Sequence, residues 1–165
     1  MPFTPFHMGP GILVKALFQG SFSLMVFGWS QIVMDLQPLV ALITGEGKLH
    51  GFTHTYVGST LIALLSAVTG KHLSQWALIM LSNGNQRGIN IRWWVAFSSA
   101  FIGAYSHVVL DSVMHVDIEP LSPFSPSNEL LGVVSVATLH KFCVYSGLAG
   151  AIVYFAVSYL QAKRR

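Results

Sequence analysis

Hydrophobic residues in this chain come in long runs separated by short stretches that contain glycine or polar residues. Four runs are apolar on all sides rather than along one stripe: 22–44, 55–70 with its neighbours, 93–114 and 132–160. A helix on a soluble surface has a one-sided stripe, whereas crossing a bilayer takes about 20 apolar residues. The pattern therefore predicts an all-α fold, an integral membrane helical bundle with four full spans that forms a single domain over residues 1–165.

The remaining segments are shorter or more polar. Residues 10–19 are too few to cross a hydrocarbon core, so we expect a short N-terminal helical segment that is re-entrant, interfacial or buried. Residues 71–92 are expected to form a loop, as is the proline-rich stretch DIEPLSPFSPSNE at 117–129. In the last run, polar residues before Phe142 indicate that the crossing begins there.

Composition supports a membrane location and excludes other classes of protein. Hydrophobic residues make up 53% of the chain and charged residues 9%, against about 25% charged in a typical soluble domain. The net charge of +3 is small and scattered, so we expect no nucleic-acid partner. Three glycines with small neighbours are expected to permit close helix packing: Gly103, Gly147 and Gly150.

Charges in the connections predict an orientation. One connection and the C-terminal tail are basic, whereas the connection after residue 115 is acidic; the residues are Lys71, Arg87, Arg92, Lys163, Arg164 and Arg165 against Asp117, Glu119 and Glu129. The positive-inside rule then predicts a multi-pass protein with a cytoplasmic C-terminus. With four spans, residues 45–54 and 115–131 lie together on the outer side.

Within the apolar run 93–114 and just after it, three ionisable residues recur every four positions. His107, Asp111 and His115 share one face of a helix. Ionisable groups inside membranes usually face the bundle and pair or line a functional cavity. On an ideal helix His107 and His115 are about 12 Å apart, so one ion could hold all three only if the helix breaks near Met114.

Other segments supply further candidate ligands. The stretch HGFTH carries His50 and His54 just before a helix start that Thr53 or Thr55 could cap. Asp35 and His7 complete the candidate metal ligands, which are His7, Asp35, His50, His54, His107, Asp111 and His115. Imidazole and carboxylate donors of this number suit one or two divalent metal ions, zinc first among them. The alternative is a hydrogen-bonded network that holds the helices together.

Several of these stretches resemble a known family. HGFTHT, GAYSHVVLD with the following His115, and LSPFSPSN are similar to the signature segments of the YdjM-like metal-dependent hydrolases of the bacterial inner membrane. That family has been related distantly to zinc-dependent phospholipase C and the P1-type nucleases. The resemblance implies a helical membrane protein that binds metal through His50, His54, His107, Asp111 and His115. Gly51 departs from the family, whose members often carry a basic residue there.

The resemblance and the donors together suggest a reaction. A divalent ion can activate a water molecule near neutral pH and polarise a phosphoryl oxygen. In a bilayer the natural substrate is a phospholipid or another lipid-linked phosphodiester. Asp35 and Asp111 are the candidate catalytic residues, and the sequence does not separate ligand from general base. The alternative is a non-enzymatic protein that uses the same residues for ion or proton transport, haem ligation or subunit packing.

Overall fold

A computed structural model of the chain describes residues 5–82 and 89–163. This part is helical and contains no strand. The elements are η1 (Pro5–His7), α1 (Met8–Phe18), η2 (Gln19–Ser21), α2 (Leu24–Met34), α3 (Leu36–Thr44), η3 (Phe52–His54), α4 (Tyr56–Leu81), α5 (Trp93–Met114) and α6 (Val136–Lys163). The charge-bearing residues Arg87, Arg164 and Arg165 lie outside the described ranges.

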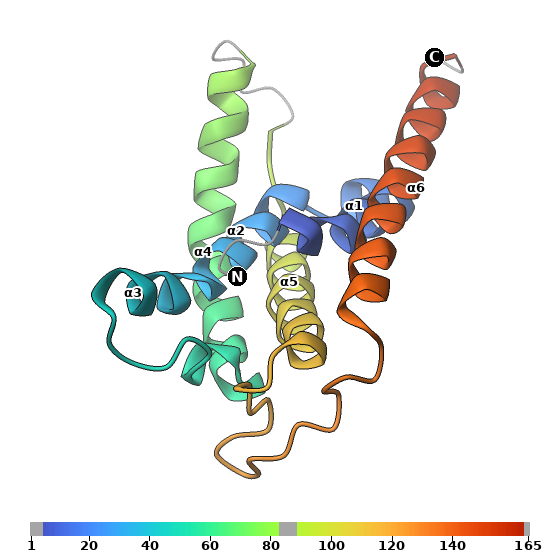
Figure 1. Ribbon diagram of the computed structural model, residues 1–165. Helices are drawn as coiled ribbons and strands as arrows, with labels where there is room; N and C mark the ends of the chain where they lie inside the picture. The colour runs from blue at the N-terminus through green and yellow to red at the C-terminus, as the bar shows by residue number, and fades with distance from the viewer. Residues whose placement is uncertain (1–4, 83–88, 164–165) are drawn as a thin grey trace.

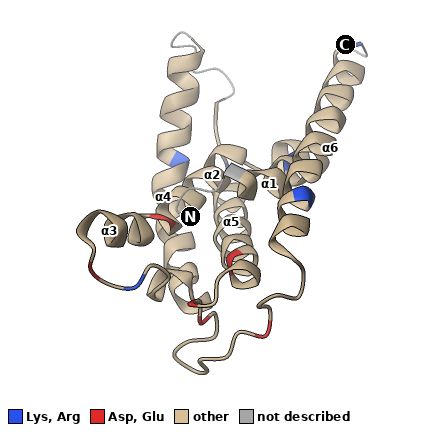
Figure 2. Ribbon diagram, viewed as in Figure 1, with Lys and Arg blue, Asp and Glu red and all other residues tan. Residues whose placement is uncertain are grey.

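Figure 1 shows the axes of α4, α5 and α6 lying roughly parallel, with α5 running in the opposite direction to the other two and with α1 and α2 lying across them. The loop before η3 and the long connection from α5 to α6 lie at the same end of these helices, as the charge pattern predicts. The last described turns of α4 and α6 lie at the other end. Acidic residues gather near the end with the two loops, and Figure 2 shows the upper parts of the long helices almost without charge.

Three helical segments of the described residues are long and apolar enough to span a membrane. They are Leu24–Thr44, Trp93–Met114 and Val136–Lys163. The fourth expected span lies in α4, which is not among these three segments, so the expectation of four spans is not confirmed. The helical membrane bundle itself is plausible on these lengths and compositions.

The expected span 22–44 is not one straight helix, and this corrects the sequence prediction. It divides at Asp35 into α2 and α3, and Asp35 is the residue between them. Pro38 lies in the first turn of α3 and has no N–H to donate to the carbonyl of Met34, which weakens the continuous helix at this point. The break places the Asp35 carboxylate where the two helices meet.

The loop expected over 71–92 was also wrong in its first half. Helix α4 continues to Leu81, and Lys71 lies within it, 7% exposed. The ammonium group of Lys71 donates hydrogen bonds to the carbonyl of Ile91 and to the amide oxygen of Asn90. Because the buried ammonium group of Lys71 is hydrogen-bonded to the segment before α5, the helix can continue through this position without leaving an unpaired charge.

Small residues allow the crossing helices to approach closely. Alanines of α4 and α5 surround α2 in two clusters, one around Met34 and one around Val26. The predicted glycines behave similarly: a Cβ on Gly150 would lie 2.6 Å from the backbone of Leu13 in α1, and one on Gly103 would collide with Ser30 in α2. The segment 10–19 is thus confirmed as a short helix, α1, which packs against α6. Helix α6 begins at Val136, within the expected apolar run 132–160.

Candidate metal centre

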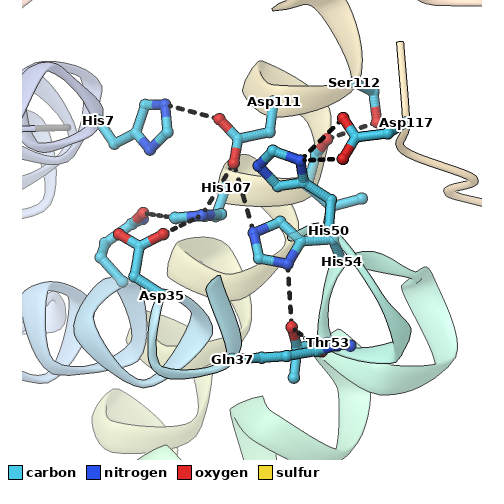
Figure 3. Close-up of polar contacts among 12 residues, drawn as sticks. His7, Asp35, Gln37, His50, Thr53, His54, His107, Asp111, Ser112 and Asp117 are labelled. Atoms are coloured by element: carbon cyan, nitrogen blue, oxygen red, sulfur yellow. Dashed lines mark hydrogen bonds and ion pairs between the residues drawn. The ribbon is translucent and has the colours of Figure 1, made fainter. Parts of the chain in front are cut away.

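Asp111 lies where three segments of the chain meet. One carboxylate oxygen is 3.3 Å from Nε2 of His7, and the other is 3.5 Å from Nε2 of His54 and 3.1 Å from Nε2 of His107. Figure 3 shows these rings turned toward the carboxylate from η1, η3 and α5. Asp111 is 4% exposed and His107 fully buried, so this is an interior polar centre.

The break between α2 and α3 adds a second carboxylate. Asp35 Oδ1 lies 3.3 Å from Nε2 of His107, on the side of the ring away from α5. His107 therefore lies between two aspartates that are 76 positions apart in the sequence. Two carboxylates held this close require positive charge between them, which a metal ion or a protonated histidine can supply.

Helix ends place the other histidines. The side chain of Thr55 accepts a hydrogen bond from the backbone N–H of Gly58 and so caps α4, which starts the helix immediately after His54. At the other end of the site, α5 stops at Met114, and His115 has extended backbone angles. The helix therefore ends near Met114, as expected if His115 is to approach the other donors. The ring of His115 stacks on that of His50, with 4.3 Å between the ring centroids.

The hydrogen bond at Nδ1 of His107 determines which ring nitrogen carries the proton in the neutral side chain. Nδ1 lies 2.6 Å from the amide oxygen of Gln31, whose amide N–H₂ donates to the carbonyl of Gly103. Because that second bond fixes the oxygen of Gln31 toward the ring, Nδ1 of His107 is the donor. In neutral His107 the lone pair is then on Nε2, which points toward Asp35 and Asp111.

His54 is oriented in the same way by a longer chain of hydrogen bonds. The hydroxyl of Thr53 donates to the amide oxygen of Gln37, so its oxygen accepts from Nδ1 of His54 at 2.9 Å. Nε2 of His54 is left to face Asp111. Gly51 leaves room for this arrangement, because a Cβ there would collide with the amide of Gln37.

His50 has a carboxylate partner that the sequence prediction missed. Both oxygens of Asp117 lie 2.9 Å from Nδ1 of His50. Burial alone would raise the pKa of Asp117, but the hydrogen bond from His50, the charges of His50 and His115 and a backbone hydrogen bond together hold that pKa below its usual range. Asp117 lies in an acidic connection without helical spacing, so only its position two residues after His115 could have drawn attention to it.

The residues present fit a metal ion. Ring nitrogens of His7, His54 and His107 are buried and have no partner of hydrogen-bonding geometry within the described chain; they are Nδ1 and Nε2 of His7 and Nε2 of the other two. Three sets of ligand atoms each lie within 4.8 Å of one another: His7, His107 and Asp111; Asp35, His54 and His107; His50, Asp111 and His115. Imidazole nitrogens with carboxylate oxygens are donors that zinc accepts, and the outer nitrogens are oriented as in many metal-binding histidines.

All seven candidate residues therefore lie in these three overlapping sets. His107 and Asp111 each belong to two of them, so two neighbouring ions could share ligands. The other two histidines lie elsewhere: His72 contacts Trp93, and His140 stacks on Phe6.

Comparison with known proteins gives one family. The family described as YdjM inner membrane protein matches residues 14–164. Neither the curated proteins nor the solved structures provide a match to this chain.

Proposed function

The chain belongs to the YdjM inner membrane protein family, and we propose that it is a metal-dependent hydrolase that binds one or two divalent ions and cleaves a phosphodiester of a membrane lipid. The observation that carries the proposal is the pair of buried rings at Asp111. His54 and His107 each donate from Nδ1 to a fixed acceptor and direct Nε2 at the same carboxylate. Neutral rings so held present lone pairs to an anion, which a cation between them would stabilise.

The proposed ligands divide between two neighbouring positions. The first is formed by His54, His107 and Asp35, with Asp111 alongside, and the second by His50, His115 and Asp111. Asp111 is then the shared carboxylate. His7 approaches the other oxygen of Asp111 from η1 and would complete the first position or orient the carboxylate.

A bound divalent ion would lower the pKa of a water molecule and polarise a phosphoryl oxygen. The protein would supply the remaining requirements. Asp35 lies at the centre beside His107 and is placed to accept a proton from that water, or else to act as a ligand. Because the surrounding helices are long and apolar, the substrate we propose is a phospholipid or a lipid-linked phosphodiester in the bacterial inner membrane, with the C-terminus cytoplasmic.

The proposal is tested by metal analysis and a lipid assay on the purified full-length chain. We expect about one or two zinc ions per chain in the wild type, a loss of most of this metal in Asp111→Asn, and no change in the matched exposed carboxylate variant Glu129→Gln. Wild-type protein in lipid vesicles should release a water-soluble phosphate product, and a chelator should stop the release.

Other outcomes would identify the alternatives. Metal-free protein with the stability of the wild type would support a hydrogen-bonded network that only packs the helices. A Soret absorption band would indicate haem. Movement of protons or metal ions across sealed vesicles without any change in the lipid would indicate a transporter.

A further inference from the structure

A cavity of about 740 Å³ lies beside the candidate metal centre, between α2 and α4 and against the start of α1. One end is polar and is lined by His7, Gln31 and Asp35, which are the residues already placed around His107. The rest is apolar apart from Ser74 and extends along α4 as far as Ala77. The cavity therefore joins the centre to the hydrophobic surface of the helices.

The apolar walls are open to the outside of the bundle. Large side chains along the cavity are substantially exposed: Met25 by 39%, Ile32 by 44% and Trp76 by 62%. Gly28 lies in the cavity wall opposite Met8, and because it has no side chain it leaves this part of the cavity unfilled. Contiguous exposed apolar surface of this kind marks a contact with lipid, a ligand or another protein.

We propose that this cavity binds one hydrocarbon chain of a membrane lipid, whose polar group then lies at the His7 and Asp35 end. Two features favour this occupant. The ionisable lining residues, His7 and Asp35, lie together at one end, and the remaining length is apolar apart from the small side chain of Ser74, which matches an amphiphile. The lining residues include no lysine or arginine that could hold an anion along that length. The volume is also within the range of ligand pockets, about 300–1,000 Å³.

The placement of the polar group rests on the proposed function, whereas binding of the chain does not. A lipid held in this way would be oriented before it reacts, because the burial of each CH₂ group stabilises one position along the cavity. The cavity would select for the presence of a long chain and not for a particular headgroup. The substrate class is therefore a lipid with at least one hydrocarbon chain that enters from the bilayer.

The experiment uses the full-length protein in vesicles of phosphatidylethanolamine and phosphatidylglycerol with a trace of phospholipid that carries a diazirine near the end of one acyl chain. After irradiation, labelled peptides are identified by mass spectrometry. We expect labelling of α2 and α4 at the cavity, reduced by excess unlabelled phospholipid. Ala77→Phe, which fills the far end of the cavity, should reduce this labelling about tenfold.

Controls separate the cavity from the general membrane surface. Ala156→Phe makes the same substitution on an exposed position of α6 and should leave cavity labelling unchanged. Trp76→Ala removes an exposed side chain that lines the cavity and does not disturb the core, and it should also lower the labelling. This variant keeps the test valid if Ala77→Phe does not fold. Metal content is measured on the same samples and should stay at the wild-type level in all three variants.

Equal labelling on all exposed apolar helices, or labelling unaffected by both cavity variants, would overturn the proposal even if metal is bound. In a parallel sample treated with a bifunctional protein crosslinker, links between two chains at α2 and α4, together with absence of lipid labelling there, would also overturn it and assign the surface to a second copy. A wild type without metal but with saturable cavity labelling would retain the chain-binding site and reject the proposed metal centre.

Discussion

The amide oxygen of Gln31 lies 2.6 Å from Nδ1 of His107. This contact fixes the ring so that its other nitrogen points toward Asp35 and Asp111. We expect Gln31→Met to weaken divalent-metal binding by about 10- to 100-fold, since the ring would lose its orienting acceptor. Metal titration followed by calorimetry measures this, and Gln161→Met, an exposed site on α6, is the control. Equal affinities for the two variants would remove Gln31 from the centre.

Asp117 is expected to act on His50 in the same way but less strongly. Its side chain is 47% exposed, so water can partly replace the carboxylate after substitution. We expect Asp117→Asn to lower the affinity of the second metal position by about tenfold and to spare the first. Titration should then show two separate binding steps where the wild type shows closely spaced ones. If both steps weaken together, the two positions are not distinct.

Because α1 and α6 pack closely at Gly150, a larger residue there is expected to lower the stability of the protein and leave its metal content unchanged. A Cβ on Gly150 would lie 2.6 Å from the backbone of Leu13, which cannot move as a flexible side chain would. We expect Gly150→Ala to lower the free energy of unfolding by about 1–3 kcal/mol. Thermal unfolding in detergent measures the change. The control is Gly20→Ala, since a Cβ on Gly20 meets nothing within 4 Å; an equally large loss there would show that the packing contact is not the cause.

The metal-free protein should become less stable in mild acid. Burial lowers the pKa of His54 and of His115 below the ordinary value of 6.5, despite the nearby Asp111 carboxylate, which acts in the opposite direction. As the pH falls through about 6.5, the unfolded chain takes up protons that the folded chain does not, so the free energy of unfolding decreases.

Melting temperatures of metal-free protein between about pH 6.5 and pH 5 test this linkage. His115→Gln removes one of the two groups and should make the decline shallower. A melting temperature that is constant or rises on acidification would contradict it.

Local pattern alone identified much of this protein. Apolar runs predicted a helical membrane protein, and the four-residue spacing of His107 and Asp111 correctly placed both on one buried face of α5. The same spacing selected His50, His54 and His115, whereas Asp35 was selected as a carboxylate inside an apolar run and His7 as a further donor near the N-terminus. The structure brings all five into the same centre. This reasoning worked because helical periodicity and the cost of burying ionisable groups are properties of short segments.

Contacts between distant segments decided the rest. The break at Asp35, the continuation of α4 beyond Lys71 and the roles of Gln31, Gln37 and Asp117 depend on neighbours that lie far away in the sequence. Which nitrogen of a histidine faces the centre is set by the acceptor at the other nitrogen, and for His107 that acceptor is 76 residues away. The cavity likewise exists only where α2 crosses α4, because a void is a property of packed helices and not of either helix alone.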